Sequence, residues 1–581
     1  MSDREIGFEA FNAKKLSPGE VARTFVVPET FRAIAGADHS YLIGPRGSGK
    51  TTLLRMLTSE SLDAWQGPRA ESYKAQIDFW SIFLPADQLW SQQTSDRHAK
   101  ALFALQALYA FTQSISYLLN GSGPAAIRKL SPTDERLLVE DLCEGWAIKP
   151  RVHTLLGLAQ EVDRLLIAVG RDEDFALQVG DNTALGLMDF TVRTFNRFTS
   201  NEGRRWAILI DEMELAPRVI HDEVSGYVRG GGGDLLVKVS MSPFDRFIDS
   251  DGSSGVPVPG HDFRVVHLSG QGRQDVERIT RGLWEEALKA RGLPAIRMEE
   301  ALGDSSYSYG YRGRSGRGTV QGVLERAYRD DQDFAKWVRR KHLNLGRLDD
   351  LSYETYSATV RKVYPLLVFR ESLARFAGGR VAGRKSGKRS ASAFVGATAV
   401  TTALEGNPRW IKIAFSEMID HWDIRRSEVS DGYQLGALVS LSSRFEALLR
   451  VLPRPESMAR SMSVMELVDS VARYMSQANL GPFQADPPNV FTIDHGAPPP
   501  VLDAIITGLY AGALVHVRDK QSPDVLDRFG GQRFRLAYVF GVRAGREFPL
   551  RLGKDVKLSS IVTPTRDAEP DRPTFLDFDW G

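Results

Sequence analysis

Short apolar runs, each followed by polar or glycine-rich residues, mark the first half of the chain. They occupy residues 40–44 (SYLIG), 206–210 (WAILI), 234–243 (DLLVKVSMSP) and 262–269 (DFRVVHLS). Short, largely apolar runs of this kind are typical of strands buried on both faces of a parallel sheet. A long helical pattern follows at 273–292. We therefore predict an α/β domain built on a parallel sheet.

Two stretches interrupt this order of strands and helices. Residues from about 92 to 200 carry helical patterns, for example at 98–121 and 154–170, and they precede the apolar run at 206–210. A second, irregular insert occupies about 295–400. We expect the first stretch to be a helical insertion within the sheet domain.

Composition places the chain among ordinary globular proteins. Its 581 residues predict about two to four domains. The net charge of +1 means that any binding of nucleic acid must come from local basic patches. Cys143 is the only cysteine, which excludes a disulfide framework and fits a reducing compartment. No apolar signal core and no uninterrupted apolar run near the ~20 residues of a membrane helix is visible. We expect a soluble, cytoplasmic protein without a membrane partner.

Residues 44–51, GPRGSGKT, match the phosphate-binding loop G-x-x-x-x-G-K-[ST] at every fixed position. An apolar strand pattern precedes the loop and a helical pattern follows it, which is the context that the motif requires. Lys50 supplies a point charge for the β and γ phosphates of ATP, and the Thr51 hydroxyl is a ligand for Mg²⁺. The predicted nucleotide-binding residues are Gly44, Pro45, Arg46, Gly47, Ser48, Gly49, Lys50, Thr51 and Thr52.

Asp211 and Glu212 directly follow the apolar run at 206–210. A carboxylate at the end of a neighbouring strand can hold the magnesium ion, and a second one can polarise the attacking water. We assign the first role to Asp211 and the second, that of catalytic base, to Glu212. The two motifs together predict hydrolysis of ATP with Mg²⁺ as cofactor.

Two later positions can sense the γ-phosphate. The run at 234–243 ends in small hydroxyl residues, so Ser240 or Ser242 is expected beside that phosphate, and Ser242 is our assignment. At 406–410, GNPRW, Pro408 begins a helix that carries Arg409 in its first turn. From a helical lid Arg409 could reach the phosphates; a routine helix cap with a surface arginine is the alternative.

These motifs resemble those of AAA+ ATPases, closest to the origin-recognition-complex type and its bacterial relatives, with STAND and KAP NTPases next. The resemblance is carried by GPRGSGKTT, by ILIDEMELAP, by the strand ending at Ser242, by GNPRW and by TFVVPETF at 24–31. It implies an AAA+ core, a helical lid and a C-terminal winged helix. It also implies that Arg409 is the lid sensor. Arg218 and Arg246 are both candidates for an arginine finger, and the sequence does not choose between them.

We expect five parts along the chain. An N-terminal segment, 1–40, leads into the nucleotide pocket, and the ATPase core covers 41–270. A helical lid with a basic insert occupies 271–425. A winged-helix-like domain at 426–562 and a C-terminal tail at 563–581 follow.

Basic stretches are the candidates for contact with DNA. Residues 307–318 interleave tyrosines with arginines, and residues 375–392 carry six basic residues without an acid. Plain solvated loops are the alternative for both. The segment 532–553 alternates apolar and basic residues and predicts a hairpin with its turn near residues 543–546. On this wing, 533–546, the residues expected to contact phosphates are Arg533, Arg535, Arg543 and Arg546. A protein-docking role for the winged helix is equally open.

We therefore expect an ATP-driven conformational switch that is associated with DNA and forms a homo-oligomer. Resemblance to bacterial relatives implies a role in an anti-phage or mobile-element system. The alternative is a nucleotide-dependent scaffold that hydrolyses ATP slowly and recruits an effector protein.

Overall fold

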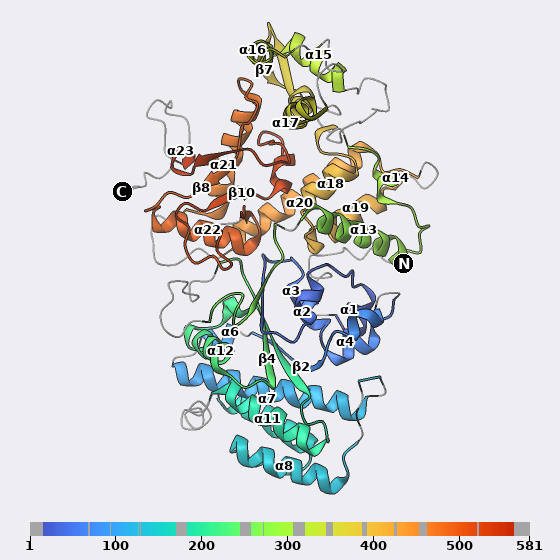
Figure 1. The fold of residues 1–581 in the computed structure, drawn as a ribbon, viewed down its shortest axis with the longest axis vertical. Coiled ribbons are helices and arrows are strands. Elements are labelled where there is room, and N and C mark those ends of the chain that lie inside the picture. The colour runs from blue at the N-terminus through green and yellow to red at the C-terminus, as the bar shows by residue number, and fades with distance from the viewer. Residues whose placement is uncertain are drawn as a thin grey trace. The chain divides into compact units, whose positions relative to one another are not determined.

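The computed structural model describes residues 16–562, apart from 68–69, 87, 93–94, 122, 126, 128, 170–182, 245–256, 271, 306–319, 344, 346–352, 386–391, 423–426, 453–461 and 520–521. The chain divides into two compact units, and each is described by itself (Figure 1). The first unit is Met1–Leu268 together with Pro523–Asp527. The second is Ser269–Ser522 together with Arg528–Gly581.

A five-stranded parallel sheet in the order β2-β3-β4-β1-β5 forms the centre of the first unit. Its strands are β1 (Ser40–Ile43), β2 (Phe79–Pro85), β3 (Arg205–Asp211), β4 (Leu235–Met241) and β5 (Arg264–His267). Strand β1 lies between β4 and β5, so the loop that follows it opens at the carboxyl edge of the sheet, where α/β proteins bind ligands. The predicted α/β fold with a parallel sheet is confirmed.

Alternate residues of each strand face two separate hydrophobic layers. Along β3, Ile208 and Ile210 lie in one buried cluster and Leu209 lies in the other. This follows from the two-residue repeat of strand side chains, which sends neighbours to opposite faces of the sheet. Covering both faces needs apolar residues at every position, and this explains the continuous apolar runs in the sequence.

Short helices cover one face of this sheet and long helices cover the other. The short helices include α1 (Pro18–Arg23), α2 (Phe31–Ala35), α3 (Lys50–Arg55), α4 (Ser59–Ala64) and α5 (Ala70–Lys74). On the other face lie α7 (Asp96–Asn120), α8 (Pro132–Trp146), α9 (Leu155–Val169), α11 (Ala184–Phe198) and α12 (Arg218–Gly230). Helix α6 (Gln88–Ser91) and the 3-10 helix η3 (Met213–Leu215) complete the elements of this unit.

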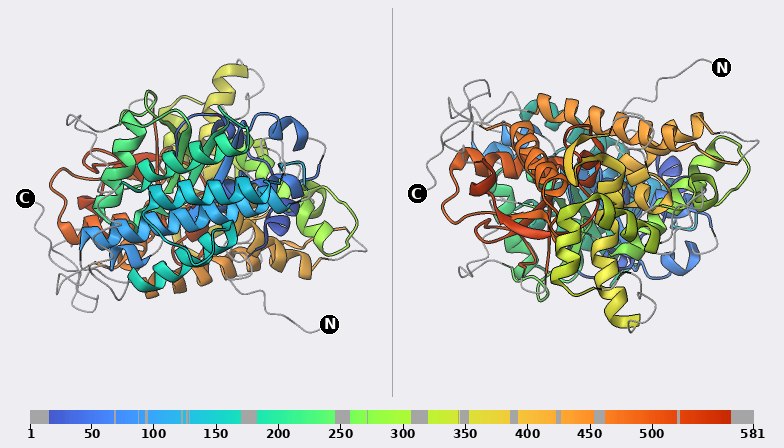
Figure 2. Two further views of the ribbon diagram at one scale, coloured as in Figure 1. Left: turned by 90° about the horizontal axis from the view of Figure 1, so that it is seen from below. Right: turned by 90° about the horizontal axis from the view of Figure 1, so that it is seen from above.

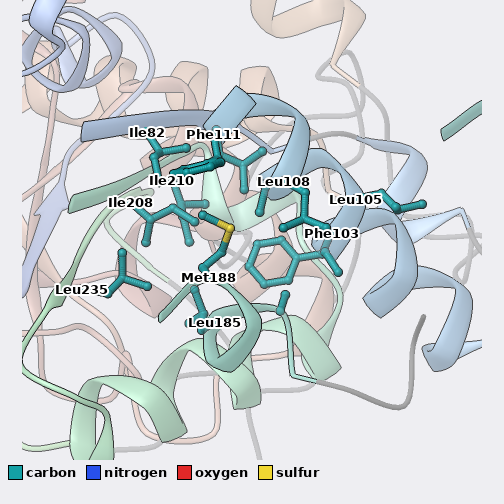
Figure 3. Packing of buried hydrophobic residues seen from close by; sticks show 14 of the residues in the cluster. Ile82, Phe103, Leu105, Leu108, Phe111, Leu185, Met188, Ile208, Ile210 and Leu235 are labelled. Carbon is teal, nitrogen blue, oxygen red and sulfur yellow. The ribbon is translucent and has the colours of Figure 1, made fainter. Parts of the chain in front are cut away.

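The helices α7 to α11 fill the interval between β2 and β3, where the sequence predicts a helical insertion. Helices α7 and α11 run side by side (Figures 1 and 2). Phe103, Phe111 and Met188 from these helices meet Ile208 and Leu235 of the sheet in one core (Figure 3). Helix α7 is long and apolar enough to cross a membrane, but 61% of its most apolar window is buried, as in the core helix of a globular domain.

The second unit begins with a group of packed helices. These are α13 (Arg273–Ala290), α14 (Met298–Leu302), α18 (Ala397–Leu404), α19 (Pro408–Asp420) and α20 (Asp431–Val451). Between α14 and α18 the chain forms α15 (Val320–Asp330), α16 (Gln332–Arg340), α17 (Tyr353–Leu373) and an antiparallel hairpin of β6 (Ala374–Ala377) and β7 (Arg380–Arg384).

A four-stranded sheet in the order β11-β8-β10-β9 forms the C-terminal part of the second unit. The elements are α21 (Val464–Leu480), β8 (Pro488–Thr492), α22 (Pro499–Ala511), β9 (Leu514–His516), β10 (Arg533–Leu536), the 3-10 helix η6 (Tyr538–Val542), β11 (Lys554–Lys557) and α23 (Ser559–Val562). Residues Pro523–Asp527, between β9 and β10, belong to the first unit, where Leu526 forms a bridge with Phe244.

The predicted hairpin of residues 532–553 is wrong. Strand β10 pairs with β9 on one side and with β8 on the other, and the chain then enters η6. All five residues of η6 are buried. Because every side of this turn meets the core, its apolar run is continuous and imitates the pattern of a buried strand.

Candidate functional site

The loop after β1 has the backbone geometry of a phosphate cradle. Gly47 and Gly49 have φ angles of 87° and 95°, in the left-handed region that other residues rarely adopt. Gly49 is the residue before α3, so the free N–H groups of that helix start at the loop. The Ser48 hydroxyl oxygen is buried and has no hydrogen-bond partner among the described residues. These features fit an anion that would accept hydrogen bonds from the loop.

Lys50 is folded back over this loop. Its side chain is only 7% exposed, and its Nζ donates to the carbonyl oxygens of Gly44 at 2.6 Å and Pro45 at 3.4 Å. A carbonyl is a weaker partner for a buried ammonium group than an anion is. The phosphates of a nucleotide would therefore be favourable replacements for these carbonyl groups.

Asp211, at the end of β3, binds two hydroxyl groups. The Thr51 Oγ1 donates to its Oδ2 at 2.7 Å, and the Ser240 Oγ donates to its Oδ1 at 2.6 Å. The carboxyl group is completely buried, and burial raises its pKa. Carboxylate and hydroxyl oxygens are the donors that Mg²⁺ prefers, so Thr51 and Asp211 form a set that fits this ion.

Glu212 follows with a left-handed backbone, at φ 60° and ψ 47°. For a residue other than glycine this conformation costs about 1 kcal/mol or more. Its backbone N–H donates to the Ser240 Oγ at 2.9 Å, and the same hydroxyl donates to Asp211. Ser240 therefore fixes both acidic residues. Backbone strain held in this way is common at catalytic sites.

The two candidate sensor hydroxyls differ in their contacts. Ser240 on β4 bonds the acidic pair, whereas the Ser242 Oγ donates to the carbonyl oxygen of Phe244, two residues along the chain. The structure brings Ser240, and not Ser242, into the network around Asp211. Side chains at 236, 238 and 240 share the sheet face on which α3 lies, which explains this proximity.

Glu214 is a third acidic residue of the site, and the sequence motifs did not indicate it. Its side chain is 11% exposed, and its Oε1 lies 3.9 Å from the Lys50 Nζ. Burial raises the pKa of Glu214 to about 7, although Lys50 acts to lower it. The visible signal was a second glutamate two residues after Glu212, in a segment with no helical or strand period.

The lid candidate Arg409 lies at the start of α19. The Asn407 side chain caps this helix by accepting from the backbone N–H groups of Arg409 at 3.1 Å and Trp410 at 3.3 Å. Arg409 belongs to the second unit, and its role as lid sensor stays a prediction. Arg218 is exposed on α12, 3.6 Å from Asp222, while Arg246 lies outside the described residues.

Two of the four arginines predicted to contact DNA are paired within or beside the C-terminal sheet. Arg533 makes a bidentate ion pair with Asp555, at 2.8 and 2.9 Å. Arg535 is only 11% exposed, forms an ion pair with Glu405, and lies 4.0 Å from the centre of the Tyr538 ring. Burial raises the pKa of Glu405, and the Arg535 charge opposes that rise.

The other two arginines share one buried acid. The Arg543 Nε lies 3.2 Å from Glu446, and the Arg546 Nη1 lies 3.4 Å from the same carboxylate. Arg546 also bonds Asp469. Glu446 is 3% exposed, so its charge requires such partners. The expectation that these four arginines form a free wing for DNA phosphates is therefore corrected: intramolecular acids occupy them.

The basic stretch 375–392 is only partly free. Arg384 contacts Glu547 at 2.7 Å and Ser476 at 2.8 Å, and the Lys385 Nζ donates to the Glu371 carbonyl oxygen at 2.7 Å. Residues 386–391, with Lys388 and Arg389, lie outside the described residues, as do the stretch 307–318 and the tail 563–581.

Comparison with known proteins supplies the family. A model of the ORC-CDC6-like family matches residues 7–558, nearly the whole chain. The chain belongs to the ORC-CDC6-like family. The predicted resemblance to AAA+ ATPases of the origin-recognition type is thereby confirmed.

Two solved structures are similar to this chain at low sequence identity. Cdc6p of Pyrobaculum aerophilum is 9% identical, with 88% of this chain and 85% of that chain covered at a TM-score of 0.25. The Aeropyrum pernix Orc1 protein, solved in complex with DNA, is 10% identical, with 89% and 92% covered at a TM-score of 0.27. None of the curated proteins matches this chain.

Proposed function

We propose that this ORC-CDC6-like protein binds ATP with Mg²⁺ at residues 44–52 and hydrolyses it, and that the cycle switches the protein between two conformations. The observation that carries the proposal is the hydrogen-bonded group of Thr51, Asp211, Ser240 and the Glu212 backbone at the mouth of the phosphate loop. Family membership supports an ATPase of the AAA+ class.

Each residue of the group has a defined task in this proposal. Lys50 leaves its carbonyl partners and binds the β and γ phosphates, while the loop N–H groups bind their remaining oxygens. Thr51 and Asp211 would hold Mg²⁺, which supplies positive charge to the phosphates when bound. Glu212 orients the attacking water and accepts its proton as the water oxygen bonds to the γ-phosphorus and the bond to the β-phosphate oxygen breaks. The Ser240 hydroxyl holds Asp211 and the Glu212 backbone in position through its two hydrogen bonds.

Binding of a labelled nucleotide to the Lys50→Ala variant tests the site. We expect the variant to lose affinity by about 100-fold, because several charge-assisted hydrogen bonds disappear together. Lys149→Ala, at an exposed lysine of the same unit, is the matched control. Wild-type affinity in the Lys50 variant would refute the site.

We further propose that the switch acts on DNA. Family membership supports this role, and the β6–β7 hairpin offers the best described surface for it. Arg375 and Arg380 on the hairpin are exposed, and neither has an ion-pair partner in the part of the chain that the structure describes. Homo-oligomerisation, a winged-helix role for the C-terminal sheet and a part in anti-phage or mobile-element systems stay predictions.

Fluorescence anisotropy with duplex DNA at several salt concentrations tests this second proposal. Replacing Arg375 and Arg380 by alanine should flatten the slope of log affinity against log salt by about 0.9 for each arginine that binds a phosphate. ATP turnover is measured with and without the same DNA. Slow turnover that DNA does not change, together with absence of DNA binding, would favour the scaffold alternative.

A further inference from the structure

We propose that Glu214 is a positioning residue that competes with the nucleotide for Lys50. Its carboxylate lies beside the ammonium group, which bonds the loop carbonyls, and incoming phosphates must displace it. Its charge therefore weakens nucleotide affinity and favours release. This inference rests on the proposed ATP site.

Lys50 is held by the loop carbonyl groups and lies close to Glu214. Its Nζ lies within 3.4 Å of two loop carbonyl oxygens, at Gly44 and Pro45, and 3.9 Å from the Glu214 Oε1. The Lys50 side chain is buried and that of Glu214 is nearly so, at 7% and 11% exposed. A cation held in this way is turned toward the protein, so binding a phosphate requires it to exchange one anionic partner for another.

Glu214 depends on Lys50 to stabilise its negative charge. Its Oε2 is buried without a hydrogen-bond partner in the described part of the chain. Lys50 is the cation that stabilises the Glu214 carboxylate, whereas the nearby charges of Asp211 and Glu212 oppose it. Taking Lys50 away would leave a buried, poorly solvated carboxylate near two others, which is costly.

Adding a nucleotide increases this cost. The phosphates bring several negative charges to a site that already contains three acidic side chains, and the cation they recruit is the one that offsets Glu214. Like charges in a poorly solvated site repel strongly. Glu214 lies in η3, which follows the left-handed backbone of Glu212 directly.

The test measures binding of a fluorescent ADP and a fluorescent ATP in EDTA, without magnesium, to the full-length wild-type chain and to Glu214→Gln. The buffer pH is about one unit above the pKa of Glu214, so that the wild-type carboxyl group is ionised. We expect the glutamine variant to bind both nucleotides about 5- to 30-fold more tightly. Asp222→Asn, at an exposed carboxylate of the same unit, is the control and should leave affinity unchanged.

A second measurement does not depend on nucleotide. Thermal unfolding of Lys50→Met, Glu214→Gln and the double variant, all without nucleotide, forms a cycle for the pair. Non-additive shifts in Tm support the contact, and additive shifts overturn it. In turnover assays, Glu214→Gln should lower KM with a smaller change in kcat, a split that a purely structural role would not produce.

The binding measurements distinguish the role of Glu214 from the proposed ATP site on which it rests. A wild-type chain that binds no nucleotide refutes the ATP site and the inference with it. A wild type that binds nucleotide, with equal or weaker binding by Glu214→Gln, refutes the role of Glu214 alone.

Discussion

Buried charges in the two units have different partners. At the phosphate loop of the first unit, Lys50 hydrogen-bonds carbonyl oxygens, with the Glu214 carboxylate farther away at 3.9 Å, and Asp211 bonds hydroxyl groups. In the second unit, Arg370 and Glu446 are more fully buried than most charges, and each meets an oppositely charged side chain. A buried charge whose hydrogen-bond partners are neutral groups can exchange them for a charged ligand. A buried charge that is paired with an opposite charge stabilises the fold instead.

Arg370 illustrates the second kind. Its guanidinium, 2% exposed, bonds the Asp331 carboxylate at 2.7 Å and the carbonyl oxygens of Asn479 and Gly481, each at 2.7 Å. Asp331 also accepts from two backbone N–H groups at the start of α16. Four of the five guanidinium N–H groups and both carboxylate oxygens of Asp331 form hydrogen bonds within the unit, so this cluster has little left to offer a ligand.

The largest effect is expected at Asp331. Replacing it with alanine leaves the guanidinium group of Arg370, which is 2% exposed, without its carboxylate partner, and should lower the free energy of unfolding by about 3–5 kcal/mol. Urea denaturation measures the change. Asp555→Ala is the matched control, because its pair with Arg533 is more exposed. A loss below about 1 kcal/mol would remove the distinction drawn between the two units.

In the first unit, a somewhat smaller effect is expected for Glu212→Gln, which removes the proposed catalytic base. Glutamine keeps the shape of the side chain but cannot accept the proton of the attacking water. We expect ATP hydrolysis to fall by about 10²-fold or more, with nucleotide binding retained. Steady-state phosphate release measures the rate, and Asp222→Asn is the control. Unchanged turnover would place the catalytic base elsewhere.

The elements around the phosphate loop could be predicted from the sequence because they are adjacent along the chain. A strand, a glycine loop and a helix follow one another within 40–55, and the acids come directly at the end of β3. It failed at β10, where Arg535 is neutralised by Glu405, 130 residues earlier in the chain. An alternating pattern shows which residues share a face, but it does not show what packs against that face.

The choice between Ser240 and Ser242 shows a finer limit. Both lie on the same side of β4 by their spacing, so periodicity alone cannot separate them. The structure does so through the end of the strand at Met241: Ser240 is still held beside Asp211, while Ser242 bonds its own loop.

Lys238 is another buried lysine of the first unit, and its hydrogen-bond acceptors are carbonyl oxygens. Its Nζ donates to Gly36 and Asp38 carbonyl oxygens at 2.8 and 2.9 Å, and burial lowers its pKa to about 7. Above that pH the folded chain has released a proton that the unfolded chain still binds, until about pH 10.4. Stability should therefore rise with pH across this window, by at most about 1.4 kcal/mol per pH unit.

Chemical denaturation of wild type and Lys238→Met at several pH values checks this expectation. The methionine variant should lose this part of the pH dependence, while Lys149→Met, at an exposed lysine, should keep it. Equal slopes in wild type and Lys238→Met would show that the lysine keeps its proton in the folded chain.

The smallest effect is expected for Arg533→Ala. Its pair with Asp555 is partly exposed, at 32% and 39%, so removing it should change the free energy of unfolding by at most about 1 kcal/mol.

Both oxygens of Asp555 already accept hydrogen bonds from the Arg533 guanidinium group. In the DNA titration, the salt slope of Arg533→Ala should therefore stay within experimental error of wild type, whereas Arg380→Ala should flatten it. Asp555→Ala frees the arginine and should steepen the slope. If Arg533→Ala flattens the slope by about 0.9, the value for one phosphate contact, the ion pair opens for DNA. The arginines of the C-terminal sheet would then be closer to the role that we propose for Lys50, in which a ligand replaces the partners, than to that of Arg370.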